Sequence, residues 1–194
     1  MGEPLPLATI QDAVLEFLRG RKDAVLFGAQ AVNAYVDESR ATQDVDVMSD
    51  RAPELAEELR QYLHERFHIA VRVREVVEGG FRIFQLQKPK NRHLVDVRAV
   101  DPLPPVRRVS RVLVLSPDEL IATKVIAFHS RKEKAKSFTD RRDLAVLLLK
   151  FPELKSEGSS VLERLAKNGA DKETLKEWKA ICAEEIKPAD DDGY

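Results

Sequence analysis

The spacing of apolar residues along the chain changes near residue 115. Before that point, short apolar runs and alternating segments typical of strands are interspersed with helical patterns. After it, apolar residues recur at intervals of three and four, as in amphipathic helices. The pattern therefore predicts a mixed α and β part followed by an all-helical part.

The first part is expected to contain three helices and a set of short strands. Helices are expected from Thr9 to Gly20, over 30–35 and from Ser49 or Asp50 to Phe67. Strands are expected over 24–27, 44–48, 69–76, 81–87, 93–100 and 109–115. Glycine and proline turns separate the three strands between residues 69 and 100, which predicts an antiparallel meander.

The second part begins at a strong helix start, Ser116-Pro117-Asp118-Glu119, with a cap, a proline and a glutamate in the favoured places. Helices are expected over about 117–130, 140–150, 159–168 and 172–186. The expected organisation is a core over 1–115, a helical part over 116–187 packed on it, and a disordered acidic tail over 188–194.

Composition limits the classes of function. The chain has 194 residues, a net charge of −1 and one cysteine, Cys182, which fits a reducing, cytoplasmic setting and an inert packing role. No apolar run approaches the ~20 residues of a membrane span, and the N-terminus lacks a secretory pattern. A partner such as nucleic acid would have to bind a local basic patch.

Two aspartates next to a glycine turn are the first sign of chemistry. Asp44 and Asp46 are two apart on a predicted strand, so they point to one face while Val45 and Val47 point to the other. Like charges held this close repel, and a divalent cation between them would relieve the repulsion. The pair therefore predicts a metal site.

Asp96 is a third candidate, because an aspartate is unusual in the apolar strand His93-Leu94-Val95-Asp96-Val97. Alone it is equally well explained as the ion-pair partner of an arginine. Together with Asp44 and Asp46 it suggests a Mg²⁺ site with one or two ions, which would activate a hydroxyl and stabilise a leaving pyrophosphate. Asp96 would bind the metal nearer that hydroxyl and act as its base.

Gly28 and Lys124 are candidates for phosphate contacts. Gly28 ends a strand before a short helix, where backbone N–H groups approach a phosphate, although a plain strand-to-helix turn explains it as well. Lys124 lies on the apolar face of its helix, where it must snorkel, meet a phosphate, or pair with Asp140 or Asp143.

Other polar groups have simpler explanations. The basic segment 131–142 is either a solvated loop or a guide for a polyanionic acceptor such as RNA. His64 and His68 have zinc-like spacing, but no partner ligand is evident in the sequence.

The combined pattern resembles a known family. It consists of Phe27 to Tyr35, the segment Arg40-Ala41-Thr42-Gln43-Asp44-Val45-Asp46, Asp96 on a later strand, and Leu120 to Lys124 followed by Asp140 to Leu144. Over about residues 10–150 it is similar to the nucleotidyltransferase superfamily with the DNA polymerase β-type fold, and most of all to its AbiEii/AbiGii toxin-like subgroup.

This resemblance implies an α+β nucleotidyltransferase fold with a mixed five-stranded sheet flanked by helices. It also implies a nucleoside triphosphate substrate, Mg²⁺, and transfer of a nucleoside monophosphate to a hydroxyl. The residues it implies for nucleotide binding are Gly28, Ala29, Gln30, Arg40, Thr42 and Lys124. Many members carry glycine or serine where this chain has Ala29, which leaves backbone donors, helped by Gln30. Arg40 and Thr42 orient the aspartates or touch phosphate, or they anchor the loop.

Three functions remain open from the sequence. The first is a Mg²⁺-dependent nucleotidyltransferase acting on RNA, protein or a small molecule, as the toxin of a toxin–antitoxin or phage-defence pair with an antitoxin partner. The second is a non-catalytic binding or regulatory protein of the same fold, for which Ala29 is the sequence support. The third is a structural cluster in which the aspartates pair with Arg40, Arg98 and Lys124.

Overall fold

The computed structural model describes residues 5–188, which divide into two compact units. The first unit holds the residues up to Ala34 together with Arg40–Leu115, and the second holds Tyr35–Ser39 and the residues from Ser116 onward. Within the described range, no helix is long and apolar enough to cross a membrane.

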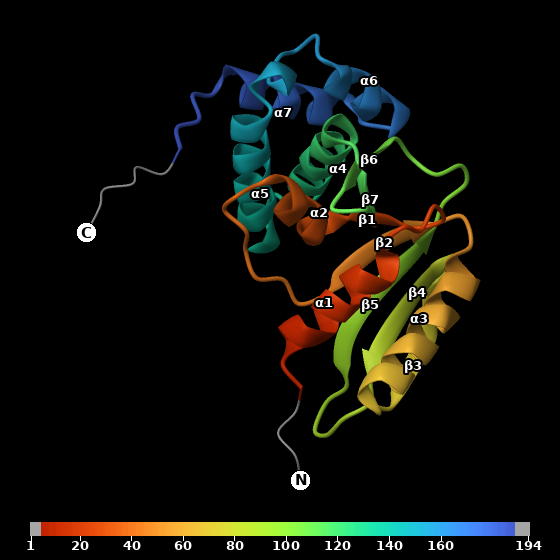
Figure 1. The fold of residues 1–194 in the computed structure, drawn as a ribbon. Helices are drawn as coiled ribbons and strands as arrows, with labels where there is room; N and C mark the ends of the chain where they lie inside the picture. Colours follow the sequence, from red (N-terminus) through yellow and green to blue (C-terminus); the bar gives the residue numbers. More distant parts are fainter. Residues whose placement is uncertain (1–4, 189–194) are drawn as a thin grey trace. The chain divides into compact units, whose positions relative to one another are not determined.

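The first unit is built on a mixed sheet with the strand order β3-β4-β5-β2-β1-β7-β6 (Figure 1). The strands are β1 (Val25–Phe27), β2 (Val45–Ser49), β3 (Val71–Val77), β4 (Gly80–Gln85), β5 (Arg92–Ala99), β6 (Val106–Val109) and β7 (Val112–Leu115). β1 runs parallel to β7 and β2 runs parallel to β5, while the other neighbours are antiparallel. The predicted α+β class and the meander β3-β4-β5 are confirmed.

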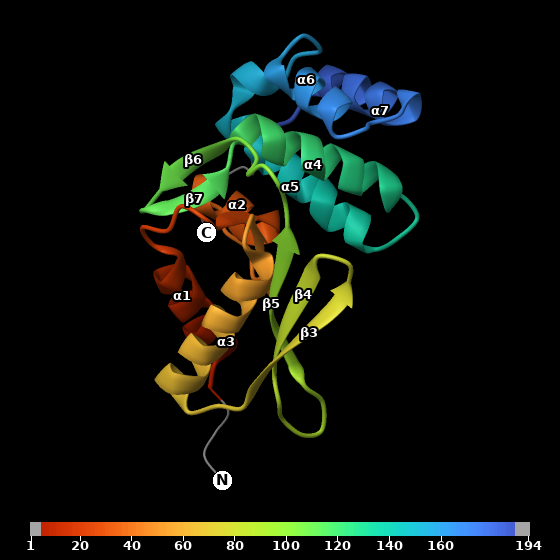
Figure 2. The same cartoon turned by 90° about the vertical axis from the view of Figure 1, so that its right-hand side faces the viewer.

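One face of this sheet forms the core of the unit. Helices α1 (Leu7–Leu18) and α3 (Ala52–Phe67) lie side by side over it, and α3 contacts β2, β3, β4 and β5 (Figures 1 and 2). Their inward stripes include Ile10, Val14, Leu55, Leu59 and Leu63, all at most 1% exposed. Alternation along the strands then turns the residues between the buried ones to the opposite face.

The sheet has seven strands, whereas the apolar pattern predicts six and the family resemblance implies five. The strand expected over 109–115 is instead a hairpin, β6 and β7, whose turn residues Ser110 and Arg111 have φ of 46° and 70°. Two left-handed residues in a two-residue turn are typical of a type I′ turn. Neither residue is a glycine or asparagine, so the sequence carried no turn signal.

The second unit is helical, with α4 (Pro117–Ser130), α5 (Lys136–Lys150), a short 3₁₀ turn η1 (Pro152–Leu154), α6 (Ser160–Lys167) and α7 (Lys172–Ala183). α4 contacts α5, α6 and α7. Leu120, Ile121, Leu144 and Trp178 are fully buried in its core. Burial raises the pKa of the Cys182 thiol in α7 to about 11, the repulsion of Glu157 adding to the effect, so this thiol is inert at neutral pH.

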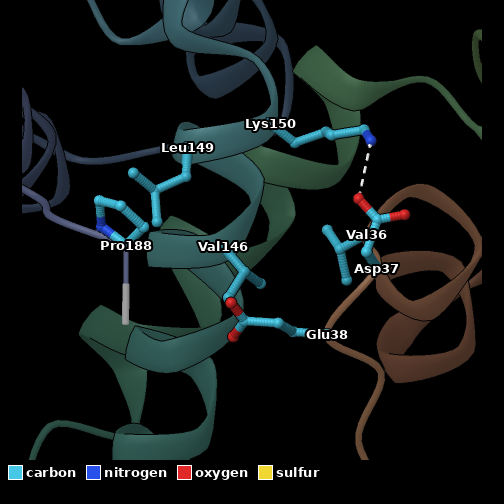
Figure 3. A pocket seen from close by; sticks show the side chains of 7 residues that line it. All are labelled: Val36, Asp37, Glu38, Val146, Leu149, Lys150 and Pro188. Atoms are coloured by element: carbon cyan, nitrogen blue, oxygen red, sulfur yellow. Dashed lines mark hydrogen bonds and ion pairs between the residues drawn. The ribbon is translucent and has the colours of Figure 1, made fainter. Parts of the chain in front are cut away.

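The segment Tyr35–Ser39 belongs to this helical unit although it follows α2 (Gly28–Tyr35) in the chain. The Tyr35 ring packs edge-on against Phe151, with centroids 5.5 Å apart. A cavity of about 200 Å³ lies beside the segment, and Lys150 Nζ on α5 lies 3.2 Å from Asp37 Oδ2 there. Figure 3 shows the residues that line this cavity and the Lys150–Asp37 pair.

Several predicted boundaries were wrong by a few residues. α1 begins at Leu7, α2 at Gly28 and α5 at Lys136, while α7 ends at Ala183. In α5 the first turn is polar apart from Phe138, which is 79% exposed, so apolar spacing gave no sign of it. The expected tail 188–194 lies, apart from Pro188, outside the described residues.

Candidate active site

Two strand pairings bring the chemistry of the first unit together. β2 pairs with β1 so that Asp46 faces Phe27, and β2 pairs with β5 so that Asp46 faces Asp96. Residues opposite one another in a sheet point to the same face. Val45 and Val47 are fully buried on the core face, which leaves Asp46 and Asp96 on the other.

Gly28 is fixed by its contact with Asp46. Its φ is +68°, and a Cβ at this position would lie 2.1 Å from Asp46 Oδ2. Glycine suits both conditions, because other residues rarely adopt this φ and a Cβ would force the Asp46 carboxylate or the turn to move. The turn after β1 and the aspartate of β2 therefore form one contact.

Asp44, His93 and Asp96 converge on the same side. One ligand atom from each lies within 4.8 Å of the others. His93 Nδ1 is 3.2 Å from Asp44 Oδ2, and His93 Nε2 is 3.1 Å from Asp96 Oδ1. Within residues 5–188, this is the group of side chains whose spacing suits a metal ion, and Asp46 is not one of its members.

Residue spacing offers no reason to include His93 in the site. In a regular strand, residues 93 and 96 point to opposite faces. Here the pairing of β4 with β5 shifts by one residue between Ile83 and Phe84, which leaves Leu94 as an extra residue in β5. Such a bulge redirects the side chains that precede it, and His93 consequently joins Asp96.

Arg82 holds Asp96 from the other side. Its Nε donates to Asp96 Oδ1 at 2.8 Å and its Nη2 donates to Oδ2 at 3.2 Å, from the position directly across β4. Burial acts to raise the pKa of Asp96, but the nearby His93 nitrogen, 3.1 Å away, and the hydrogen bonds from Arg82 outweigh it and lower that pKa to about 2. Asp96 is therefore ionised at neutral pH.

A row of charged residues crosses the sheet at this level. The pairings place Arg74, Arg82, Asp96 and Asp46 opposite one another on β3, β4, β5 and β2. Two residues further along β5, the guanidinium of Arg98 lies over the Phe27 ring, 5.2 Å from its centroid. The acidic site thus borders an arginine-bearing part of the same face.

The loop before β2 is held by polar contacts. Asn33 Nδ2 donates to the Arg40 carbonyl at 2.8 Å, and Arg40 N donates to Asn33 Oδ1 at 3.0 Å. Thr42 Oγ1 donates to the Asp44 carbonyl at 3.1 Å. These contacts anchor the loop and place Asp44, and a phosphate contact of Arg40 or Thr42 stays a prediction.

The two residues after Gly28 differ in their surroundings. Ala29 is buried in the first turn of α2. Gln30 lines a cavity of about 310 Å³ together with Leu15, Leu26 and Val114. Leu26 pairs with Val47, so this cavity lies on the core side of the sheet and not on the side of Asp46. Nucleotide contacts of both residues stay predictions.

Lys124 belongs to the second unit and is paired there. Its Nζ lies 2.7 Å from Asp143 Oδ2 and 3.3 Å from Asp140 Oδ1, and both aspartates are buried. Arg131 adds a bond to Asp140 Oδ2 at 3.0 Å. This is the structural pairing that the sequence left open, and a phosphate contact of Lys124 remains a prediction.

Several basic side chains of the segment 131–142 also have partners inside the second unit. Lys132 pairs with Glu177, and Arg141 pairs with Glu184. Arg142 Nη2 donates to the Glu38 carbonyl at 2.7 Å. These contacts favour a structural role for much of the segment.

The donor set of the site fits a divalent cation. Asp44 and Asp96 offer carboxylate oxygens, which Mg²⁺ prefers as ligands. Mn²⁺ also binds carboxylate oxygens. The His93 nitrogen within the same reach adds a donor suited to transition metals. Asp46, facing Asp96 across the strands, adds a further carboxylate to this face.

Solved structures share the fold. The Megavirus polyadenylate synthase has a TM-score of 0.59 at 13% identity, and the match covers 75% of this chain and 32% of that protein. JHP933 from Helicobacter pylori has a TM-score of 0.53 at 12% identity over 90% and 88% of the two chains. The antibiotic-resistance factor ANT(2″)-Ia has a TM-score of 0.50 at 16% identity over 90% and 95%.

At the level of sequence, none of the curated proteins compared with the chain matches it. A family described as "Nucleotidyl transferase AbiEii toxin, Type IV TA system" matches residues 13–194. The match covers most of the chain and confirms both the predicted family and the predicted enzyme class. The chain belongs to the AbiEii nucleotidyltransferase toxin family.

Proposed function

We propose that this protein transfers a nucleoside monophosphate from a nucleoside triphosphate to a hydroxyl group, with Mg²⁺ held by Asp44, Asp46 and Asp96. The observation that carries the proposal is the placement of these carboxylates on one sheet face beside the Gly28 turn, in a chain of a nucleotidyltransferase family. The acidic face supplies the charge that a cation requires.

The metal, when bound, neutralises phosphate charge and favours both the attacking hydroxyl and the leaving pyrophosphate. The protein's part is to position its carboxylates. The sequence pattern also suggests Asp96 as a base, but a carboxylate whose pKa is about 2 suits a metal ligand better than a proton acceptor.

The nucleotide is proposed to bind near the Gly28 turn. The backbone N–H groups at the start of α2, which follow Gly28 and lie beside Asp46, would donate to a phosphate. Ala29, Gln30, Arg40, Thr42 and Lys124 complete the proposed nucleotide-binding set, on the strength of the family resemblance.

The acceptor and the biological setting belong to the same proposal. The acceptor is an RNA, a protein or a small molecule that presents a hydroxyl. The family description names a toxin–antitoxin system, so we propose the role of a toxin with an antitoxin partner. The lone Cys182 favours a cytoplasmic setting.

A non-catalytic binding protein is the second candidate. Arg82 contacts both oxygens of Asp96, and Ala29 offers a phosphate no side-chain donor. In such a protein, the ion pair would persist and no transfer would occur.

A transfer assay separates the transferase from the non-catalytic binding protein. It measures transfer of label from each of the four α-labelled triphosphates to cell RNA, protein extract or small acceptors. The proposal predicts Mg²⁺-dependent transfer by the wild type and its loss in Asp46→Asn. Asp50→Asn, an exposed aspartate four residues later, is the matched control and should retain activity. Nucleotide binding without transfer to any acceptor would favour the second candidate.

A further inference from the structure

Asp96 is bound on both of its oxygens by one side chain. The Arg82 fork contacts Oδ1 at 2.8 Å and Oδ2 at 3.2 Å. His93 Nε2 adds a third contact, 3.1 Å from Oδ1. Asp96 is thus engaged by basic side chains at the position where the proposed metal ion requires a ligand.

A metal ion and Arg82 would compete for the same two oxygens of Asp96. An ion that coordinates Asp96 must take at least one of the two oxygens, and it would then lie close to the guanidinium. That group keeps its positive charge at every accessible pH, so the repulsion cannot be relieved by loss of a proton.

Arg82 is also able to leave. Its side chain is 38% exposed, and that of Asp96 is 28% exposed. Ion pairs that solvent reaches to this extent are weak, because water replaces much of the interaction. The contact is therefore weak enough to be exchanged for a divalent ion.

We propose that Arg82 competes with the metal ion for Asp96, so that Asp96 joins the metal site only after Arg82 has moved away. The inference rests on the proposed function, since it takes Asp96 as a metal ligand. The competing possibility, that Arg82 supports the bound site by orienting Asp96, predicts the opposite effect on metal affinity.

The full chain is titrated with Mn²⁺ alone, and binding is measured by calorimetry or by loss of the paramagnetic resonance signal of the free ion. The titration tests whether removal of Arg82 raises or lowers the affinity for Mn²⁺. Arg82→Gln removes the charge, and its Mn²⁺ affinity should rise about five-fold, the factor expected from a partly exposed ion pair. Arg82→Lys keeps the charge and loses the fork, so its affinity should fall between the two.

Arg74→Gln is the matched control. Arg74 is exposed, and it lies on β3 directly opposite Arg82 of β4. Its removal therefore changes the local charge and leaves the ion pair between Arg82 and Asp96 in place. Its effect on Mn²⁺ affinity should stay below about two-fold, because exposed charges at this distance are screened. Circular dichroism of each variant verifies that the sheet is intact.

The outcomes separate this inference from the proposed function. Unchanged or weaker Mn²⁺ binding in Arg82→Gln, or an equal gain in Arg74→Gln, overturns the competition while leaving the metal site standing. If the wild type and Arg82→Gln both fail to bind Mn²⁺, or if Asp44→Asn and Asp96→Asn bind it as the wild type does, both proposals fall.

Discussion

The contact between Gly28 and Asp46 leaves no room for a side chain. Gly28→Ala should place a methyl group on the Asp46 carboxylate and force either the turn or the aspartate to move. We expect a loss of more than about 1 kcal/mol in the free energy of unfolding, the usual cost of a left-handed alanine, together with loss of nucleotide transfer.

Gly20→Ala isolates the backbone part of this effect. Gly20 has a φ of +79°, and nothing lies within 4 Å of the place that a Cβ would take, so it carries the same strain without the clash. Urea unfolding should therefore show a smaller loss for Gly20→Ala than for Gly28→Ala, and transfer should survive. Equal losses in both variants would mean that the Asp46 contact is unimportant.

The ionisation of Asp96 makes the stability of the fold depend on pH. Its pKa is about 2 in the folded protein, against 3.8 as the ordinary value, so the ionised form stabilises the fold above about pH 4. That contribution is lost as the pH falls from about 4 to about 2. It is on the order of 1 kcal/mol, given the solvent exposure of the pair.

Asp96→Asn removes the titrating group. The difference in unfolding free energy between wild type and Asp96→Asn should change by this amount between about pH 5 and about pH 2, to the disadvantage of the wild type at low pH. Denaturant melts at a series of pH values measure it. A difference independent of pH would show that Arg82 and His93 do not hold the carboxylate in solution.

At the scale of the strands, part of the site followed from the sequence and part did not. Alternation placed Asp44 and Asp46 on one face, because it depends only on residues two apart. His93 could not be found this way, since it reaches that face through the extra residue Leu94 in β5. Arg82 was missed because its role depends on pairing between strands, which residue spacing does not reveal.

The β6–β7 hairpin offers a test of the turn that was not predicted. Ser110 and Arg111 are left-handed, which favours asparagine and glycine. Ser110→Asn combined with Arg111→Gly should raise the unfolding free energy by about 0.5–1 kcal/mol, because the new residues adopt this geometry with less strain. A lower melting temperature of the double variant in calorimetry would contradict the turn assignment.

At the scale of the molecule, the change in apolar spacing near residue 115 predicted where the strands would give way to helices. The structure adds that Tyr35–Ser39 joins the helical unit, through contacts of Tyr35 with Phe151 and of Asp37 with Lys150. Spacing along the chain contains no information about such distant contacts, so the membership of Tyr35–Ser39 in the helical unit could not be predicted from it.

Substitution of Lys124 distinguishes a structural role of this lysine from a phosphate-binding role. Lys124→Met would leave Asp140 and Asp143 buried without their shared cation, at a cost of about 3–5 kcal/mol. The single tryptophan, Trp178, is fully buried in this unit and reports its unfolding by fluorescence. The urea midpoint of the fluorescence transition should fall markedly.

Lys134→Met is the control, because Lys134 is exposed in the same unit. Its midpoint should match that of the wild type. If Lys124→Met is as stable as Lys134→Met yet loses nucleotide binding, Lys124 contacts phosphate and the aspartate pairing is secondary.

Anomalous diffraction from crystals grown with Mn²⁺ and a non-hydrolysable triphosphate would locate the cation itself. Carboxylate oxygens of Asp44, Asp46 and Asp96 should then lie within about 2.5 Å of an anomalous peak, with Arg82 withdrawn from Asp96 and the triphosphate beside Gly28. A peak elsewhere, or no peak while the Arg82–Asp96 pair persists, would contradict a metal-dependent transfer site on this face of the sheet.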